Sequence, residues 1–596
     1  MINQIIAEGV AEAVKILYQA DVSPQEVQIQ KTRKEFEGDI TVVVFPFTRM
    51  GRKSPEAIGE EIGKFLQENL QKVGFYNVIK GFLNVSLKNN YWLDFLIGKL
   101  AEEKFGISEV QAGKPVVIEF SSPNTNKPLH LGHVRNILLG DSIASILEAG
   151  GRKVARVNLV NDRGIHICKS MLAWQKWGEG TTPETADKKG DKFVGDYYVQ
   201  FEKQKKLQVK QKMLEGYSEE EADRESQLMQ DAREVLKKWE QGDPETRSLW
   251  SNMNEWVYLG FDETYKRIGA GFDKIYYESD TYLLGRELVK EGLERGILYE
   301  KEDGSIWCDL SDKKLSDKLL LRSDGTSVYM TQDLGTAQLR YDDYHPDKLL
   351  YVVGNEQNHH FDVLKAILQK LGKEYAKDII HISYGMVELP HGKMKSREGT
   401  VVDADDLIDE MHETAAETTR ALGKIEDFSE EEANRLFETI GLGALKYFIL
   451  KVDPKKHMLF NPEESIQFDG NTGPFIQYTH ARIRSLLRKA AGRGFKAPYL
   501  ENIQDFDLLH RERQILRLLH DFPEILQQAA DTYSPALVAN YVYELVKEYN
   551  GFYQDTPVLR EEDENKIRFR LALSEFTARI VRSAMQLLGI EVPERM

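Results

Sequence analysis

Apolar and polar positions follow three successive patterns along the chain, and together these predict a multidomain α/β protein. The first 110 residues begin with helical periodicity, which gives way to strand-like runs at Asp39–Phe47 and Gly81–Leu87 with a helix from Ser54 between them. From Val116 onward, short strand patterns alternate with helical ones, which is typical of a parallel sheet with crossover helices. After Asp403 the periodicity is helical, so we expect an all-α C-terminal bundle.

The first strand of the predicted parallel sheet leads into the stretch that organises its domain. An apolar run from Val116 to Phe120 predicts a buried strand, and Pro128 suits the first turn of a helix after it. A strand that leads through a tight turn to a helix N-terminus binds anions, because unpaired N–H groups and the helix dipole point at the ligand. His130 and His133 would share one helix face, and Gly132 would leave room for a close approach. The pattern predicts a nucleotide α-phosphate site.

Further strands and one long insertion complete the predicted sheet domain. The second strand covers Lys153–Asn161, and the sheet resumes at Asp347–Phe361 and Asp378–Leu389. Between about 180 and 250 the chain is long, charged and helical, which interrupts the alternation of strands and helices. We therefore expect a helical insertion between the two halves of the sheet.

A compact group of cations follows the last predicted strand. Lys393, Lys395 and Arg397 lie within five residues, and Gly399 closes the group. Such a loop suits a pyrophosphate leaving group, because preplaced positive charge stabilises developing negative charge. A basic surface turn is the alternative interpretation.

The densest basic segment lies near the C-terminus, within Asp469–Lys496, beside the aromatic residues Phe475 and Tyr478. Basic side chains interleaved with aromatic ones are typical of RNA-binding surfaces. The chain as a whole carries 79 basic and 96 acidic residues, a net charge of −17. That balance argues against a general nucleic-acid coat protein but leaves room for a local RNA-binding patch.

The sequence predicts no membrane span, signal peptide, disulfide framework or zinc site. No run of 18 apolar residues predicts a membrane span, and the N-terminus lacks the basic start and cleavage site of a signal peptide. Cys168 and Cys308 are too few for a disulfide framework, which favours a reducing compartment. His359 and His360 are adjacent and lack the spacing of metal ligands on one helix face, so we expect no zinc site.

Six stretches occur in the order and spacing seen in arginyl-tRNA synthetases: SSPNTNKPLHLGH, NDRG, DGTSVYMTQD, VVGNEQNHHF, GKMKSREGT and TGPFIQYTHARIRSLL. The chain resembles this class I family over nearly its whole length. The resemblance implies a Rossmann-type parallel-sheet catalytic domain flanked by an α/β N-terminal module and an all-α C-terminal bundle. The implied parts are a tRNA-core-binding module at 1–110, the catalytic domain at 111–400 with its helical insertion at about 180–250, a connecting helical segment at 401–465 and an anticodon-binding domain at 466–596.

The resemblance also implies a reaction. ATP activates L-arginine as arginyl-adenylate, and the arginyl group then passes to the 3′ end of tRNA(Arg). Mg²⁺ is expected with the ATP and no other metal, in a cytoplasmic monomer without a membrane segment. The implied residues are His130, His133, Lys127, Lys393, Lys395 and Arg397 for catalysis; His130, Gly132, His133, Met394 and Ser396 for ATP; Asn124, Asn158, Tyr329, Asp333 and Gln357 for arginine; and Arg482, Arg484, Arg488, Lys489 and Tyr549 for tRNA.

Two of these residues fit the chemistry of arginine on their own. Tyr329 and Asp333 are four residues apart and would share a helix face. A carboxylate accepts the planar guanidinium fork through two parallel hydrogen bonds, which the ammonium of lysine cannot reproduce. Asp333 would therefore discriminate between amino acids as well as bind.

The basic loop departs from the KMSKS pattern of class I enzymes, because Ser396 stands where the pattern has its second lysine. Many arginyl enzymes share this departure, and the resemblance implies that Lys127, just before the HIGH-like motif, compensates for it.

Three other functions remain alternatives. Another class I synthetase, for cysteine or lysine, would lack a reason for Tyr329 and Asp333, and the cysteine enzyme would also need clustered Cys and His zinc ligands. A small-molecule nucleotidyltransferase would have no use for the helical C-terminal bundle and its basic patch. A non-catalytic RNA-binding paralogue would be expected to carry damaged motif residues, and HLGH and the arginine signature are intact.

Overall fold

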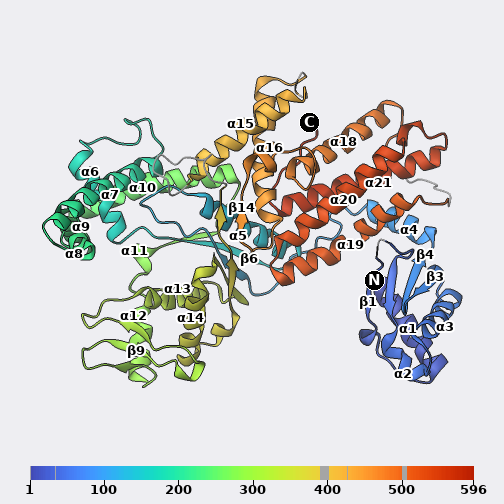
Figure 1. Cartoon of the computed structure of the whole chain (residues 1–596), viewed down its shortest axis with the longest axis horizontal. Helices are drawn as coiled ribbons and strands as arrows, with labels where there is room; N and C mark the ends of the chain where they lie inside the picture. The colour runs from blue at the N-terminus through green and yellow to red at the C-terminus, as the bar shows by residue number, and fades with distance from the viewer. Residues whose placement is uncertain are drawn as a thin grey trace. The chain divides into compact units, whose positions relative to one another are not determined.

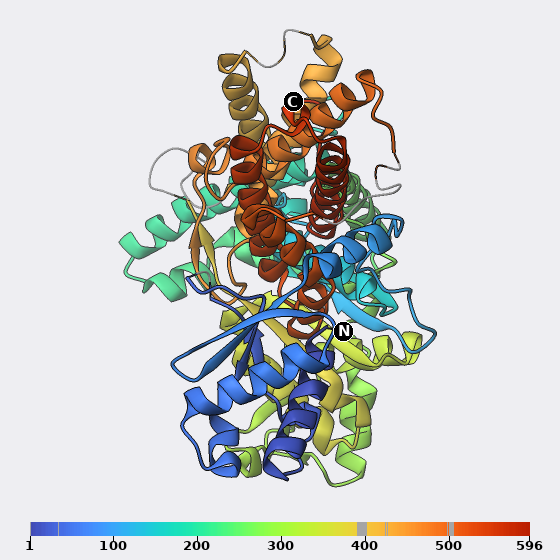
Figure 2. The same ribbon diagram turned by 90° about the vertical axis from the view of Figure 1, so that its right-hand side faces the viewer.

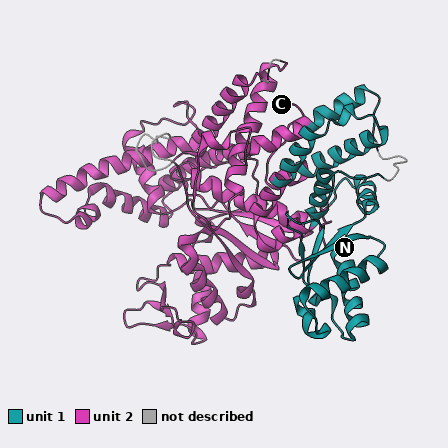
Figure 3. Ribbon diagram, turned by 45° about the vertical axis from the view of Figure 1, so that its right-hand side comes forward, with its two compact units in different colours: residues 1–105, 483–523, 544–581 teal, residues 106–482, 524–543, 582–596 magenta. Residues whose placement is uncertain are grey.

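The computed structural model describes residues 2–33, 35–389, 402–423, 425, 427–497, 499 and 506–596. The chain divides into two compact units (Figure 3): residues 1–105, 483–523 and 544–581 form the first, and residues 106–482, 524–543 and 582–596 form the second. The long C-terminal helices contribute to both units, which agrees with the predicted all-α C-terminal region. They are α18 (Gly473–Gly492), α19 (His510–Thr532), α20 (Pro535–Asp555) and α21 (Glu564–Leu587).

The first unit contains a four-stranded antiparallel sheet in the order β1-β2-β4-β3. Helix α3 packs against β3 and β4, and α1 packs against α3 (Figure 2). The predicted helix start is confirmed, because the Ser54 side chain accepts a hydrogen bond from the N–H of Ala57. The elements are α1 (Ile2–Tyr18), β1 (Ile29–Lys31), β2 (Ile40–Val43), α2 (Thr48–Gly51), α3 (Pro55–Asn69), β3 (Val73–Ile79), β4 (Phe82–Leu87) and α4 (Asn89–Leu100).

The strand predicted at Asp39–Phe47 is shorter than expected. β2 ends at Val43, and Phe45–Phe47 forms a 3₁₀ helix with a proline near its start. Proline has no N–H to donate to a sheet, so the strand cannot continue through it.

The second unit is built on a five-stranded parallel sheet in the order β12-β11-β5-β6-β7, which confirms the predicted Rossmann-type architecture (Figure 1). The chain adds β6 and β7 on one side of β5 and then β11 and β12 on the other. Such a reversal opens a crevice at the carboxyl ends of the two central strands, where ligands of this architecture bind. The strands are β5 (Val116–Glu119), β6 (Val154–Val160), β7 (Lys274–Tyr277), β11 (Lys348–Gly354) and β12 (Ile379–Tyr384).

Helices cover both faces of this sheet. Alternate residues of the central strands, such as Val117 and Val157, share a buried core with Leu334 of α13 (Tyr329–Tyr344) and residues of α14 (Asn358–Lys370). Helix α5 (Leu131–Ala149) contacts β5, β6 and β11. A Cβ at Gly140 of α5 would lie 2.2 Å from the ring of Phe120, so glycine is what permits this close approach.

Between β6 and β7 the chain is helical, over a range that includes the insertion predicted at about 180–250. Figure 1 shows it as a group of helices beside the sheet: α6 (Ile165–Trp177), α7 (Gly190–Leu214), α8 (Glu219–Arg224), α9 (Gln227–Glu240) and α10 (Pro244–Ile268). The sequence analysis did not predict β7 or the antiparallel sheet β10-β9-β8, whose strands are only two to four residues long. The remaining elements are α11 (Glu278–Thr281), α12 (Gly285–Glu294), β8 (Tyr299–Glu300), β9 (Ile306–Cys308), β10 (Lys318–Leu321), β13 (Val387–Glu388), α15 (Ala404–Ala421), α16 (Glu430–Leu450), β14 (Met458–Leu459) and α17 (Pro462–Ser465). No helix in the described ranges has the length and apolar character needed to cross a membrane.

Candidate functional site

The turn after β5 holds two residues in the left-handed backbone region. Ser121 and Ser122 have φ angles of +76° and +46°, which residues other than glycine rarely adopt. The side-chain oxygen of Asn136 accepts a hydrogen bond from the Ser121 N–H at 2.5 Å, and that of Asn158 accepts one from the Ser122 N–H at 3.0 Å. Asn158 is fully buried, and its amide nitrogen donates to the hydroxyl of Tyr265. Asn158, predicted to bind arginine, therefore holds the turn itself.

The two histidines of the HLGH stretch lie side by side at the start of α5. The helix begins at Leu131 with His130 as its N-cap, so the prediction that Pro128 opens the helix is wrong. Nδ1 of His130 accepts a hydrogen bond from the Gly132 N–H at 3.1 Å, and Nδ1 of His133 accepts one from the His130 N–H at 3.2 Å. The ring centroids are 3.8 Å apart. Because each Nδ1 accepts, a neutral ring carries its proton on Nε2 and presents that N–H as a donor.

Burial keeps both rings neutral at pH 7. It lowers the pKa of His130 to about 4, with the charge of Lys127 acting in the same direction. It also lowers the pKa of His133 well below its usual value, and the charge of Lys127, together with that of His130 when protonated, adds to this effect. The ammonium of Lys127 has its own pKa lowered by burial. Within the described part of the chain, no hydrogen bond or ion pair engages this ammonium. The start of α5 thus combines one cation with two neutral hydrogen-bond donors.

Helix α13 carries two of the predicted arginine-binding residues one turn apart, which confirms their shared helix. Tyr329 is its first residue and is 80% exposed. The carboxylate of Asp333 lies 2.5 Å from Nε2 of His360 on α14. Gln357 is exposed on the turn between β11 and α14, and Asn124 is exposed in the turn after β5. The structure therefore joins Asp333 to a histidine and leaves the other three candidates open to a ligand.

Glu278 is a candidate that the sequence analysis missed. It follows β7 at the carboxyl edge of the parallel sheet and begins α11. Burial raises the pKa of its carboxyl group to about 7; Asp162 and Asp333 act in the same direction, while Arg163 and a hydrogen bond with Gln332 oppose them. Glu278 is thus a second acidic group within electrostatic reach of Asp333. Its signal in the sequence is an acidic residue directly after a strand, which is visible only once the short run before it is recognised as a strand.

The residues of the predicted cationic loop lie outside the described part of the chain: Lys393, Met394, Lys395, Ser396 and Arg397. The chain that follows them lies against the start of α5, because Leu131 N–H donates to the carbonyl of Val402 at 3.0 Å and Ala404 N–H donates to that of Leu129 at 2.9 Å. Asp403 caps α15 there, and burial raises the pKa of its carboxyl group to about 6. The backbone of Val402 and Ala404 therefore pairs with that of Leu131 and Leu129, on either side of His130.

Helix α18 carries the basic residues predicted to bind tRNA. Arg488 and Lys489 are exposed, whereas Arg482 and Arg484 are partly buried. The guanidinium of Arg482 lies 4.7 Å from the ring centroid of Tyr478, within the range of a cation–π contact. The exposed end of this basic patch is therefore the part that can reach a phosphate backbone.

The prediction of a tRNA contact at Tyr549 conflicts with the structure. The residue is fully buried in α20, and its hydroxyl donates a hydrogen bond to Oγ of Ser574 at 2.9 Å. A side chain without exposed surface has nothing to stack on a base. The helical spacing of the apolar residues around it places Tyr549 in the core of the bundle.

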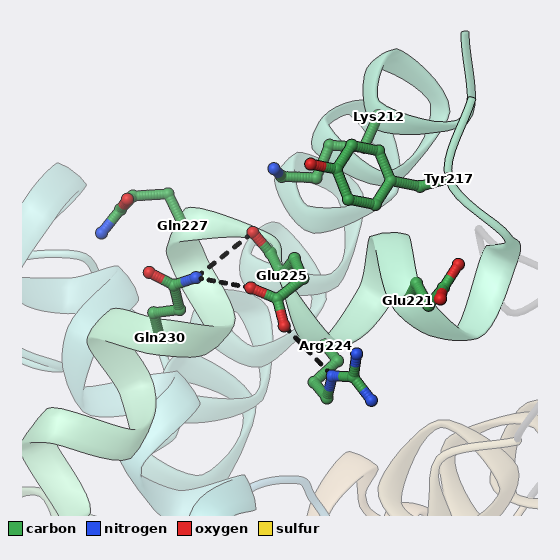
Figure 4. A pocket seen from close by; sticks show the side chains of 7 residues that line it. All are labelled: Lys212, Tyr217, Glu221, Arg224, Glu225, Gln227 and Gln230. Atoms are coloured by element: carbon green, nitrogen blue, oxygen red, sulfur yellow. Dashed lines mark hydrogen bonds and ion pairs between the residues drawn. The ribbon is translucent and has the colours of Figure 1, made fainter. Parts of the chain in front are cut away.

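A hollow of about 510 Å³ lies where α7, α8 and α9 meet (Figure 4). The figure shows the amide of Gln230 and the guanidinium of Arg224 both directed at Glu225, and the ammonium of Lys212 lies 5.0 Å from the ring centroid of Tyr217. These polar groups engage one another, and the hollow includes none of the candidate residues. We assign no ligand to it. Among the residues that the structure describes, no group of three or more His, Cys, Asp or Glu side chains is arranged to hold a metal ion.

Comparison with known proteins decides the family. Residues 99–461 match the model of the family described as tRNA synthetases class I (R), catalytic domain. An arginine–tRNA ligase from Bacteroides fragilis is 58% identical over 596 residues, covering the full length of both chains. The chain belongs to the arginyl-tRNA synthetase family. Two further family models match on either side of the catalytic domain: arginyl tRNA synthetase N terminal domain at residues 2–87 and DALR anticodon binding domain at residues 476–596.

Other arginyl-tRNA synthetases agree with this membership. An arginine–tRNA ligase from Porphyromonas gingivalis is 55% identical, again over the full length of both chains. The solved arginyl-tRNA synthetase of Thermus thermophilus covers 100% of both chains with a TM-score of 0.80 at 25% identity. Membership in this family confirms the resemblance drawn from the six sequence stretches. It also argues against the cysteine and lysine enzymes and the small-molecule nucleotidyltransferase as alternatives.

Proposed function

We propose that this protein ligates L-arginine to tRNA(Arg) in two steps. The carboxylate of arginine attacks the α-phosphorus of ATP; a new oxygen–phosphorus bond forms as the bond to pyrophosphate breaks, which gives arginyl-adenylate. A hydroxyl at the 3′ end of the tRNA then attacks the activated carbonyl, and AMP leaves. The observation that carries the proposal is the pair of acidic groups, Asp333 and Glu278, in a chain that belongs to the arginyl-tRNA synthetase family.

Recognition of arginine rests on those two carboxyl groups. The guanidinium has five N–H donors in a rigid fork, and carboxylates accept them with better geometry than any neutral group. Glu278 has a pKa near 7 without ligand, so a bound guanidinium would favour its charged form and displace its proton. Tyr329, Gln357 and Asn124 are exposed and available for the remaining polar groups of arginine.

The histidines contribute hydrogen bonds rather than charge. His130 and His133 each present an Nε2–H donor that can stabilise negative charge on the α-phosphate oxygens. Among the described residues, Lys127 places a cation beside the two histidines, and its ammonium is available for the pyrophosphate leaving group. Catalysis would then come mainly from positioning and preplaced electrostatics.

The proposal also assigns roles to the other domains and names the metal, the oligomeric state and the cellular compartment. Residues 1–110 would bind the tRNA core, 111–400 would carry catalysis, 401–465 would connect, and 466–596 would bind the anticodon, with Arg482, Arg484, Arg488 and Lys489 on the RNA side. Lys393, Met394, Lys395, Ser396 and Arg397 would complete the ATP site, and Mg²⁺ would enter with ATP. The protein would work as a monomer in the cytoplasm, where tRNA is charged.

ATP–pyrophosphate exchange tests the proposal directly. The purified protein is assayed with each of the twenty amino acids, with and without total tRNA, and the transfer of each labelled amino acid to tRNA is then measured. We expect exchange and transfer with arginine alone. Exchange with another amino acid, or none under any condition, would contradict the proposed function.

A further inference from the structure

A buried ion pair involves α13, the helix that carries Asp333. Arg340, near the end of α13, is 2% exposed, and its guanidinium pairs with the carboxylate of Glu119, the last residue of β5. Taking two charges out of water carries a large desolvation cost, and well-packed apolar residues are often at least as stabilising as such a pair. The pair therefore calls for an explanation other than stability.

The guanidinium of Arg340 meets three strands of the parallel sheet. Besides Glu119 on β5, its Nη1 donates a hydrogen bond to the hydroxyl of Tyr351 on β11 at 3.1 Å. Its Cζ lies 5.3 Å from the ring centroid of Tyr351 and 5.5 Å from that of Tyr276 on β7, in the range of cation–π contacts. Arginine suits this position because its planar fork can pair, donate and stack at once. The contacts fix α13 against the sheet near its carboxyl edge.

The same contacts connect the arginine pocket to the phosphate-binding turn. Asp333 precedes Arg340 by two helical turns on the same face of α13. Glu119 accepts a hydrogen bond from Oγ of Ser122 at 3.2 Å, and Ser122 is one of the two left-handed residues of the turn before α5. Burial raises the pKa of Glu119; the charge of Arg340 opposes that rise, and the charge of Asp333 adds to it. Asp333 and Glu119 thus share one electrostatic environment, in which Arg340 supplies the compensating charge.

We propose that Arg340 is a positioning residue for arginine recognition, an inference that rests on the proposed function. It does not touch the substrate. Its pairing with Glu119 sets the register of α13 on the sheet, and so sets the distance from Asp333 to the turn that holds Asn124 and leads to His130. It also keeps the charge of Glu119 internally neutralised, so that the negative charge offered to the guanidinium of the substrate comes from Asp333 and Glu278.

The test removes both charges together, so that no unpaired charge is left buried. The full-length double variant Arg340→Met with Glu119→Gln is assayed for arginine KM, ATP KM and kcat in ATP–pyrophosphate exchange, with thermal unfolding measured in parallel. We expect an arginine KM raised roughly ten-fold or more, because small misplacements at a recognition site are costly, with the ATP KM unchanged. Arg340→Lys, which keeps the charge and loses the fork, should give a smaller rise.

A second group of paired charges in the same domain provides the matched control. Arg156 of β6 pairs with Glu148 at 2.7 Å and with Asp141 at 3.3 Å, both on α5, near the amino end of its strand. Arg156→Met with Glu148→Gln and Asp141→Asn, which leaves neither partner charged, should change thermal unfolding without raising the arginine KM.

Three outcomes would overturn the inference. A folded Arg340 and Glu119 double variant with the parent arginine KM would show that the pair is only structural. If that variant does not fold, Arg340→Lys decides, and an unchanged arginine KM in it contradicts the proposal. If the parent protein itself activates no arginine, both this inference and the proposed function fail, whereas failure of the inference alone leaves arginine activation by the parent intact.

Discussion

Asp333 and His360 are in direct contact, with the carboxylate oxygen 2.5 Å from Nε2 of the imidazole. The acidic group proposed to recognise a guanidinium is thus already oriented by a side chain from α14. An ionised carboxylate has about four lone-pair positions, so one imidazole contact still leaves room for a two-pronged guanidinium. His359 and His360 are adjacent and lack the spacing of metal ligands on one helix face. The structure gives His360 a different role, because it holds the carboxylate of Asp333 in place.

Substituting Asp333 should impair the use of arginine far more than the use of ATP. We expect Asp333→Asn, which preserves shape and removes the charge, to cost on the order of 2–5 kcal/mol in kcat/KM for arginine, as for a broken charge pair. Exchange kinetics with arginine and ATP varied separately measure this. Asp342→Asn, an exposed change on the same helix, is the control and should be neutral. Parent kinetics in Asp333→Asn would remove this residue from the pocket.

The affinity for arginine should rise with pH around neutrality. The pKa of Glu278 is raised to about 7 by burial, so at pH 6 the group is mostly protonated and at pH 8 mostly charged. Only the charged form attracts a guanidinium, and arginine KM should therefore fall as pH rises from 6 to 8. Glu278→Gln should abolish the pH dependence of the arginine KM and raise that KM most at pH 8. The KM for ATP should vary with pH in the same way in the parent and in the variant. An equal pH dependence of arginine KM in parent and variant would contradict the role of Glu278.

The elements that sequence reasoning found are those whose cause is local. The Ser54 cap, the charged helix α7 and the strand from Val116 can all be recognised from neighbouring residues, because capping, periodicity and apolar runs act over a few positions. Strand β7 is four residues long and carries no distinctive alternation, so it was missed, and Glu278 was missed with it.

What could not be predicted depends on contacts between distant residues. The pairing of Arg340 with Glu119 joins two elements that only the folded sheet brings together. His130 carries its ring proton on Nε2 because its Nδ1 accepts a backbone hydrogen bond at the N-cap. A helix that began at Pro128 would not have placed His130 at the N-cap. Tyr549 was predicted to contact tRNA from the resemblance alone, and a resemblance in sequence does not show whether a side chain reaches the surface.

Binding of tRNA should depend on salt through the exposed end of α18. Each phosphate contact contributes about 0.7–0.9 to the slope of log K against log salt concentration. The double variant Arg488→Ala with Lys489→Ala should therefore weaken tRNA binding and flatten that slope, as measured by filter binding across a salt series. Lys290→Ala, an exposed lysine on α12, provides the control. If the slope is the same in the double variant and the parent, the patch does not contact phosphates.

Removing the last eight residues should destabilise the protein. Their backbone carbonyls accept hydrogen bonds from three buried side chains: Lys446 donates to Gly589 at 2.5 Å, Gln477 to Glu591 at 2.8 Å, and His480 to Pro593 at 2.9 Å. A buried donor deprived of its acceptor costs about 1–3 kcal/mol.

We therefore expect truncation after Leu588 to lower the thermal unfolding temperature markedly, whereas removal of residues 595 and 596 alone, which leaves all three acceptors in place, should change it little. Equal unfolding temperatures for the parent and the longer truncation would mean that water replaces these acceptors without cost.

Lys127 should act on the transition state of adenylate formation. Its ammonium lies close enough to both histidines to lower their pKa values, and no described side chain neutralises it. A preplaced charge of this kind stabilises the departing pyrophosphate, and removing one such contact typically costs about 10²–10³ in kcat. Lys127→Ala should therefore lower kcat for ATP–pyrophosphate exchange and leave arginine KM unchanged, the pattern of an interaction made only in the transition state. Lys153→Ala, an exposed lysine directly before β6, is the control.

A second change separates loss of charge from loss of structure at Lys127. Ser396 stands where the class pattern has a lysine, so Ser396→Lys can return a cation to the same reaction from the loop side. We expect Lys127→Ala with Ser396→Lys to recover part of the lost kcat, because the stabilisation depends on charge at the pyrophosphate and not on which segment supplies it. Ser396→Lys alone should change little, since Lys127 already supplies that charge. If Lys127→Ala by itself activates arginine at the parent rate, the ammonium does not act on the leaving group, whatever the double variant does.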